Sequence, residues 1–515
     1  MTIDRESRSL RRVEFLPQCR RYRLLLFLAI FVAALLVRWY QFDTVGFSPN
    51  RQHHSAIIAR ALYYQDNDAV PEWERQVSRA QTRYLSPLEP QIGEMLAAAV
   101  YRSLGREDLN FPRMLSVFWW MIGAVFLFLL ARRITSDEAA WVALVFYLFL
   151  PFGMVASRSF QPDPLMIMTL LASLLAIVHY EEQPTWGRLF LAAGVSAVSI
   201  FVKAPATFLI LGAFIALFIS RGRMRDWRRL AVFLAVCSVP VIFYYGHNIM
   251  TGGRLSAQLA SSFLPHLWIQ PMYWAGWLAM IHIVIGFPAL VAGIVGVAFL
   301  LTGRSRALLV GLWSAYVVYG LIMTYHIATH DYYSLMLIPI VALSLGPTMV
   351  SLLGWIGEWV PSRVAMLAIF LCCTALGMAS AGIRSVEYNY DRHARWQRNE
   401  RAIAQEIGEL VEHSTETVFI SISDGYPLMY WGKLRGVSYS IRTEALEIIA
   451  GPKRNNLEVL LGPNNLGFRP KYFIVTELLE FRRAPGLSDF LFQNFPVLAH
   501  EVDYIIFDLT EQRSK

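Results

Sequence analysis

Ionisable side chains stand at several points where an apolar segment of this sequence begins or ends. Asp163 follows Arg-Ser-Phe-Gln-Pro and directly precedes a long apolar stretch. An ionisable residue that enters a lipid-buried segment is costly and usually serves a function. Aspartate is also a good helix cap, and Pro164 suits a first helical turn, so a structural role is the alternative. Both roles are compatible, and we expect Asp163 to be catalytic.

A second polar group follows the first apolar segment and consists of Arg51, Gln52, His53 and His54. Such side chains could bind phosphate, coordinate a metal ion or move protons. Neighbouring histidines on a helix point about 100° apart, so this pair does not form a metal site by itself. A polar loop at the membrane interface explains the spacing equally well. We take the two histidines as candidate catalytic residues and the two residues before them as candidate substrate ligands.

Polar residues also occupy two later segments between apolar runs. Lys203 could extend its ammonium group to the interface or pair with an anionic phosphate. The sequence His-Asp-Tyr-Tyr starts at His330, and its tyrosines fit an interfacial aromatic belt, whereas its histidine and aspartate do not. The further candidate substrate ligands are Arg158, Lys203, His326, His330, Asp331 and Tyr333.

The apolar content of the chain requires a lipid environment. Of the 515 residues, 56% are hydrophobic and 16% are charged, whereas soluble domains carry roughly 25% charged residues. One soluble core cannot bury this surface, because soluble domains stop growing near roughly 250–300 residues. We therefore predict an α-helical polytopic membrane protein with about eleven transmembrane helices. They lie near residues 24–39, 113–131, 139–156, 163–180, 187–202, 204–220, 230–246, 276–301, 308–325, 333–353 and 363–382.

The basic residues predict the orientation of these helices. The net charge is +8, but no nucleic-acid-binding motif accompanies it, and we expect no nucleic-acid partner. If the N-terminus is cytoplasmic, most arginines fall on the inside, and the short outside loops hold only Arg158, Lys203 and Arg254. This is the positive-inside bias, and the candidate site residues then lie at the outer face. A single span over 187–220 would put the arginines of 221–229 on the outside, so the positive-inside bias favours two separate spans at 187–202 and 204–220.

The long stretch 41–112 lies outside in this topology and is not a span. It contains two amphipathic candidate helices, Ala56–Tyr64 and Ile92–Leu104, which could lie along the membrane surface. We assign residues 1–385, including this outer loop, to a transmembrane domain.

An odd number of spans also places the C-terminus outside. Beyond about residue 385 the sequence becomes more polar, and short β-type runs appear at Val418–Ser423, Tyr472–Thr476 and Tyr504–Leu509. Helix-like stretches lie between them. We predict a small α/β domain over residues 386–515.

The order of these motifs resembles the bacterial membrane glycosyltransferases of family 39, which have the GT-C fold. Relatives include protein O-mannosyltransferases and the aminoarabinose transferases that modify lipid A. The first family motif is matched by Arg51, Gln52, Ala56, Ile58, Ala59 and Arg60. The second is matched by Arg158, Pro162, Asp163, Pro164 and Leu165, and the last by His330, Asp331, Tyr332, Tyr333 and Pro339. The resemblance covers roughly residues 20–350.

This resemblance implies a transferase of the bacterial inner membrane with a periplasmic C-terminal domain. Such enzymes move a sugar from a polyprenyl-phosphate carrier to an acceptor outside the membrane, which can be a lipid, a glycan or a protein of the cell envelope. The leaving group is a lipid phosphate, whose developing charge Arg and Lys side chains stabilise. Arg51, Arg158 and Lys203 are the candidates for that role.

The general base is less clear from the sequence. His54 occupies a position where the family often has an acidic residue. A neutral histidine, with an unperturbed pKa near roughly 6.5, can act as a base. Alternatively Asp163 or Glu89 is the base, an anionic acceptor needs none, or the chain has lost transferase activity.

A divalent metal ion is a possible cofactor. Glu89–Pro90 matches a Glu-Pro element that helps hold a metal in aminoarabinose transferases. A histidine of the loop containing His247 and His266 could complete a carboxylate–histidine pair. We name Glu89 and His266 as candidate metal ligands.

A transporter or flippase for lipid-linked glycans is the alternative class. It predicts internal helix repeats and polar residues near the bilayer midplane. The sequence shows no such repeat, and its polar residues gather at one face.

Overall fold

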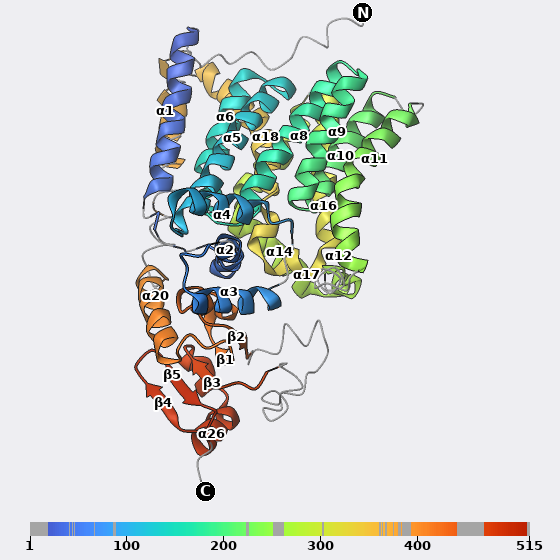
Figure 1. Ribbon diagram of the computed structural model, residues 1–515. Coiled ribbons are helices and arrows are strands. Elements are labelled where there is room, and N and C mark those ends of the chain that lie inside the picture. Colours follow the sequence, from blue (N-terminus) through green and yellow to red (C-terminus); the bar gives the residue numbers. More distant parts are fainter. Residues whose placement is uncertain are drawn as a thin grey trace, which may run out of the picture. The chain divides into compact units, whose positions relative to one another are not determined.

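The computed structural model describes residues 19–511 of the chain, apart from several internal gaps (Figure 1). Its description omits residues 41, 44, 46, 66, 86–88, 223–225, 251–261, 301–302, parts of 360–392, and 440–467. The chain divides into two compact units. Unit 1 consists of residues 1–42, 88–92 and 113–387, and unit 2 of residues 43–87, 93–112 and 388–515.

Unit 1 is built from helices. The helices of its first half are α1 (Arg20–Trp39), α5 (Asn110–Ile134), α6 (Asp137–Phe149), α7 (Pro151–Ala156), α8 (Asp163–Glu182), α9 (Trp186–Val202), α10 (Ala206–Ser220) and α11 (Trp227–Val241). Those of its second half are α12 (His247–Met250), α14 (Pro271–Val284), α15 (Phe287–Ala298), α16 (Gly303–Ile322), α17 (Thr324–Thr329) and α18 (Leu337–Trp359). Short 3-10 helices form at η3 (Pro265–Ile269) and η4 (Asp331–Ser334).

The helices of unit 1 confirm an α-helical membrane fold. Among the described residues, six helices are long and apolar enough to cross a membrane, and the bent pair α14–α15 brings the number to seven. Helices α9 and α10 are shorter apolar helices and are separate, as the basic residues predicted. The predicted last span, 363–382, lies partly outside the described residues. The count of about eleven spans therefore stays a prediction.

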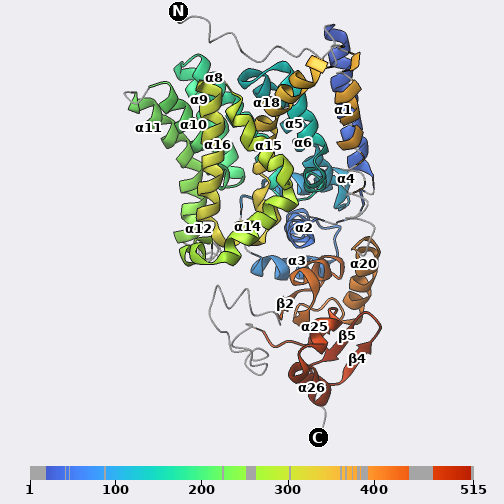
Figure 2. The same ribbon diagram turned by 180° about the vertical axis from the view of Figure 1, so that it is seen from behind.

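Small residues allow the central helices of unit 1 to pack closely. Helix α10 packs against α16, and α8 packs against α9 and α10, so these helices run side by side in both views (Figures 1 and 2). A Cβ atom on Gly212 would lie 2.5 Å from the Cβ of Ala315 and 2.8 Å from the carbonyl oxygen of Gly311. Glycine at these positions permits the close backbone approach that membrane helices use in place of a hydrophobic driving force.

A sharp bend separates α14 from α15. The two helices meet at 91°, and Gly286 between them has a φ of 76°. Glycine adopts this left-handed conformation without the steric cost that a side chain would add.

Unit 2 combines helices from distant parts of the chain with a five-stranded sheet from the C-terminal region. Its helices are α2 (Pro49–Tyr64), α3 (Glu72–Tyr84), α4 (Ile92–Leu104), α20 (His393–Leu410), α21 (Tyr426–Trp431), α25 (Leu478–Arg482) and α26 (Pro485–Asn494). Its strands are β1 (Thr417–Ile420), β2 (Gly436–Ser438), β3 (Tyr472–Val475), β4 (Val497–His500) and β5 (Ile505–Asp508). The sheet order is β2-β1-β3-β5-β4, with β1 parallel to β2 and β3 and the other pairs antiparallel.

The C-terminal sheet confirms the predicted small α/β domain. Buried residues of its central strands, including Val418, Phe473 and Phe507, pack against Phe481 and Leu491 of the following helices. The outer-loop helices α2 and α3 were expected in the transmembrane domain. Their contacts instead group them with this C-terminal region, because α2 packs against α3 and α21.

Candidate functional site

Asp163 and Lys203 form a buried ion pair in unit 1. Asp163 is the first residue of α8, and Lys203 directly follows α9. The Nζ atom of Lys203 lies 2.8 Å from both carboxylate oxygens of Asp163, and both side chains are almost completely buried. Pro162 is the N-cap of α8, so Asp163 occupies the first helical position and not the cap position that the sequence offered as an alternative. The positive end of the helix dipole further favours an anion here.

Two tyrosine rings complete the surroundings of the Lys203 ammonium group. Its Nζ lies 5.3 Å from the ring centroid of Tyr332 and 5.5 Å from that of Tyr333. Both distances are within cation–π range. Sequence analysis assigned the tyrosines partly to an aromatic belt and omitted Tyr332 from the candidate ligands. The folded chain brings both rings to the lysine.

The candidate residues His326 and His330 lie beside the same rings. The His326 ring stacks on Tyr333 with centroids 4.8 Å apart, and the His330 ring lies 5.6 Å from that of His326. The Nδ1 atom of His330 is 2.7 Å from the hydroxyl oxygen of Thr329. The predicted residues Asp163, Lys203, His326, His330 and Tyr333 therefore form one cluster.

Burial changes the titration of two groups in this cluster. Burial, followed by the charges of His330 and Lys203, lowers the pKa of His326 to about 4. Burial raises the pKa of Asp331, and the nearby Asp163 adds to that effect. At neutral pH, His326 is therefore uncharged and can accept or donate a hydrogen bond through a ring nitrogen. Within the described residues its Nδ1 is buried and has no hydrogen-bond partner.

We expect acidification from pH 7 to pH 5 to destabilise the wild type more than a His326→Gln variant. Between pH 6.5 and about 4, His326 binds a proton in the unfolded chain but stays neutral in the folded chain. The stability that neutral His326 contributes is complete above pH 6.5, and about 2 kcal/mol of it is lost at pH 5. Thermal unfolding in nanodiscs at both pH values measures the difference, and equal losses in the two proteins would contradict the prediction.

Arg158 and Gln161 are buried between α7 and α8, next to the cluster in sequence. The backbone carbonyl of Arg158 accepts a hydrogen bond of 3.1 Å from Nε of Arg113, whose guanidinium also donates to the carbonyl of Phe42. The guanidinium of Arg158 lies 5.5 Å from the Phe42 ring centroid. Neither side-chain polar atom of Gln161 has a hydrogen-bond partner within the described structure. Sequence analysis did not single out Gln161, and only its place in the motif before Asp163 could have indicated it.

The remaining catalytic candidates lie on α2 in unit 2. The Nδ1 atom of His53 is 2.7 Å from the carbonyl oxygen of Pro49, and the His54 ring lies 5.5 Å from that of Tyr426. Gln52 donates to the carbonyl of Phe47, and Arg51 precedes it in the same helix. The structure therefore groups Arg51, Gln52, His53 and His54 on one helix, whereas Asp163 and Lys203 belong to the other unit.

A carboxylate that sequence analysis did not select also lies beside this helix. Ser55, the residue after His54, donates a hydrogen bond of 2.7 Å to Oε1 of Glu94 on α4. No sequence signal distinguished Glu94 from other acids of the amphipathic outer loop, because the pairing depends on how α2 and α4 fold together.

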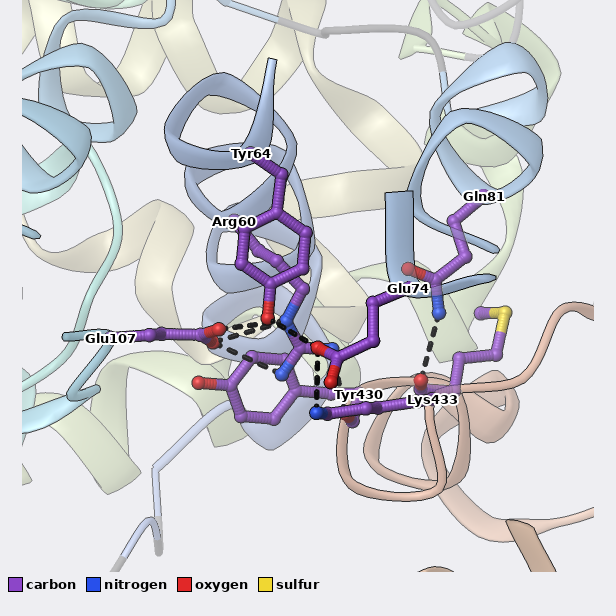
Figure 3. A network of polar contacts seen from close by, with 8 residues as sticks. Arg60, Tyr64, Glu74, Gln81, Glu107, Tyr430 and Lys433 are labelled. Atoms are coloured by element: carbon purple, nitrogen blue, oxygen red, sulfur yellow. Dashed lines mark hydrogen bonds and ion pairs between the residues drawn. The ribbon is translucent and has the colours of Figure 1, made fainter. Parts of the chain in front are cut away.

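A buried polar network connects α2 and α3 to α21 (Figure 3). Arg60 pairs with Glu107 at 2.9 Å and donates a hydrogen bond of 2.8 Å to the carbonyl of Tyr430. Gln81 donates to the carbonyls of Met429 and Leu434, each at 2.8 Å. Burial lowers the pKa of Arg60, but the charge and hydrogen bond of Glu107, together with Tyr430 and Tyr64, outweigh it and raise the pKa above its ordinary value. These contacts explain why the outer loop and the C-terminal region form one unit.

The two predicted metal ligands lie on different segments of the described chain. Glu89 is half-buried before α4, and His266 is exposed in η3. Among the residues that the structure describes, no three His, Cys, Asp or Glu side chains are grouped to hold a metal ion. The divalent metal ion therefore stays a prediction, and no step of the chemistry below depends on one.

Comparison with known proteins relates this arrangement to a family. Residues 95–245, which include Arg158, Asp163 and Lys203, match the family described as dolichyl-phosphate-mannose-protein mannosyltransferase. No curated protein sequence matches the chain.

Solved structures share the fold at low sequence identity. ArnT from Cupriavidus metallidurans bound to undecaprenyl phosphate is 14% identical, with a TM-score of 0.58 over 93% of this chain and 97% of that one. Its apo state is 13% identical, with a TM-score of 0.56 over 94% and 98%. The apo oligosaccharyltransferase of Archaeoglobus fulgidus is 10% identical, with a TM-score of 0.55 over 88% of this chain and 69% of that one. This chain has the GT-C fold that ArnT shows, and its residues 95–245 resemble the protein mannosyltransferases. The resemblance inferred from its motifs is thereby confirmed.

Proposed function

We propose that the protein is a membrane glycosyltransferase that moves a sugar from a polyprenyl-phosphate donor to an acceptor of the cell envelope. The observation that carries the proposal is the buried Lys203–Asp163 pair under the rings of Tyr332 and Tyr333. In such a site a buried cation can bind the donor phosphate, a carboxylate can accept a proton, and aromatic rings can contact the sugar. The relation to ArnT and the mannosyltransferases supports the same reaction class.

The donor phosphate would compete with Asp163 for Lys203. During transfer, the bond between the anomeric carbon and the phosphate oxygen breaks, and its electron pair stays on the phosphate. Lys203, with Arg158 as the second candidate, stabilises this charge in a site from which water is largely excluded. An ammonium group that turns toward the phosphate leaves Asp163 without its partner.

A released Asp163 carboxylate is then suited to act as the general base. The acceptor oxygen forms a bond to the anomeric carbon and gives its proton to this carboxylate. His326, neutral and with an unpartnered buried nitrogen, is placed to hydrogen-bond a sugar hydroxyl. His54 remains the alternative base on α2.

The positive-inside bias supports a multi-pass topology in a bacterial inner membrane with a cytoplasmic N-terminus. In that orientation the cluster around Lys203 faces the periplasm, as does unit 2. Envelope lipids, glycans and proteins are then the accessible acceptors.

Transfer in reconstituted vesicles tests the proposal. We expect purified protein to move radiolabel from a polyprenyl-phosphate sugar to an acceptor in an envelope extract. Unlabelled polyprenyl phosphate should inhibit the transfer because it occupies the Lys203 site, whereas farnesol, which lacks the phosphate, should not.

Two results would contradict this assignment. Movement of labelled donor across the vesicle membrane without transfer would indicate a flippase instead. Neither transfer nor movement with any envelope extract would indicate a member of the family that has lost its activity.

A further inference from the structure

Unit 2 contains a cavity that the proposed transfer chemistry does not use. Its volume is about 610 Å³, within the range of roughly 300–1,000 Å³ typical of small-molecule sites. Its walls come from the segment before α2 and from α2, from residues 107–110, from α20, and from α21 with the following Lys433. All of these lining residues belong to unit 2.

One wall of this cavity is fixed by internal contacts. Arg60 is held by Glu107 and by the carbonyl of Tyr430, and its guanidinium lies 4.1 Å from the Tyr430 ring centroid. These groups satisfy one another, so this wall is preorganised before any ligand enters (Figure 3).

Another part of the lining, on α20, presents polar groups without internal partners. Within the described part of the chain, neither the carboxyl group of Glu400 nor the amide of Gln405 makes a hydrogen bond or an ion pair, although both line the cavity. Burial raises the pKa of Glu400 to about 8, so at neutral pH it is mostly a protonated acid that both donates and accepts hydrogen bonds.

The charge of the lining argues against a strongly charged ligand. Four acidic and three basic side chains face the cavity. Because Glu400 is mostly protonated at neutral pH, the remaining charges balance. An anion such as a nucleotide would meet three carboxylates, and an apolar ligand would leave the polar groups unpaired.

Aromatic rings stand beside these polar groups. The rings of Tyr430 and Trp431 are 4.6 Å apart and nearly perpendicular, and the guanidinium of Arg401 lies 4.4 Å from the Trp431 ring centroid. Rings of this kind offer an apolar surface next to hydrogen-bonding groups. A pyranose has the matching structure, with an apolar C–H face and hydroxyl groups at its edge.

We propose that this cavity binds a neutral saccharide, which forms the recognised part of the acceptor. The role as acceptor rests on the proposed glycosyltransferase function, whereas saccharide binding follows from the cavity alone. Glu400 and Gln405 hydrogen-bond the hydroxyl groups, and Trp431 contacts the C–H face.

Saturation-transfer NMR on the full chain in lipid nanodiscs tests this inference without any donor. The probes are neutral trisaccharides of mannose, glucose, galactose and N-acetylglucosamine, with trigalacturonate as an anionic probe of similar size. We expect at least one neutral trisaccharide to bind, and Glu400→Ala and Gln405→Ala each to weaken it about tenfold, the effect of one good hydrogen bond.

The matched control is the variant Glu409→Ala. Glu409 is exposed on the same helix and does not line the cavity, so this variant should bind the trisaccharide as the wild type does. The inference is overturned if no neutral trisaccharide binds, if trigalacturonate binds more tightly, or if neither α20 variant changes binding. Since Glu400 and Gln405 have no internal partners, their variants should fold. Binding without transfer would refute the proposed enzyme activity and leave the saccharide site intact.

Discussion

Replacement of Asp163 by asparagine should lower the transfer rate at least about 100-fold, the cost of losing a group that acts on developing charge. The amide keeps the shape of the side chain but can neither carry the negative charge that pairs with Lys203 nor accept the acceptor proton. Lys203→Met should have an effect of the same size, because it removes the cation beside the leaving phosphate. Initial rates in the reconstituted vesicles measure both.

The same substitutions should also change stability in a way that separates structure from chemistry. The two side chains are buried and bonded only 2.8 Å apart, so removal of either one leaves an unpaired buried charge at a cost of about 3–5 kcal/mol. The double variant Asp163→Asn/Lys203→Met contains no unpaired charge and should recover most of this stability. It should not recover transfer.

A carboxylate elsewhere in unit 1 provides the control. Glu138 on α6 is half-buried and makes no contact with the cluster, and Glu138→Gln should retain both stability and transfer. Full transfer by the Asp163→Asn variant would remove Asp163 from the mechanism, and transfer by the double variant would reduce the pair to a structural role.

The sequence indicated which residues matter more reliably than how they pair. The order of motifs around Asp163 and His330 predicted the fold class, because each motif stands at the end of an apolar helix. Sequence analysis offered a phosphate as the partner of Lys203. The structure shows that Asp163, 40 residues earlier, holds it. That pairing is set by the packing of α8 against α9, and no pattern of neighbouring residues in the sequence predicts it.

The placement of the outer loop could not be predicted for a similar reason. Arg60 matched a family motif, but its partners are Glu107 and a carbonyl 370 residues away. Hydrophobic periodicity identified α2 and α4 as helices and says nothing about contacts at this separation. The metal ion, which was inferred from a Glu-Pro element and a histidine of a later loop, stays a prediction.

The second large effect is expected from Arg60→Met, which should destabilise the chain by about 3 kcal/mol, because it leaves the mostly buried carboxylate of Glu107 without its cation. The same change removes the hydrogen bond that joins α2 to α21, so trypsin should cleave the C-terminal region of the variant faster than that of the wild type. Thermal unfolding and limited proteolysis in nanodiscs measure the two effects. Arg79→Met is the matched control on α3, since its ion pair with Glu72 is exposed and should contribute little. A variant Arg60→Met that unfolds and is cleaved like the wild type would show that the sheet region holds its place without this network, and the grouping of the outer loop with the C-terminal region would then need another cause.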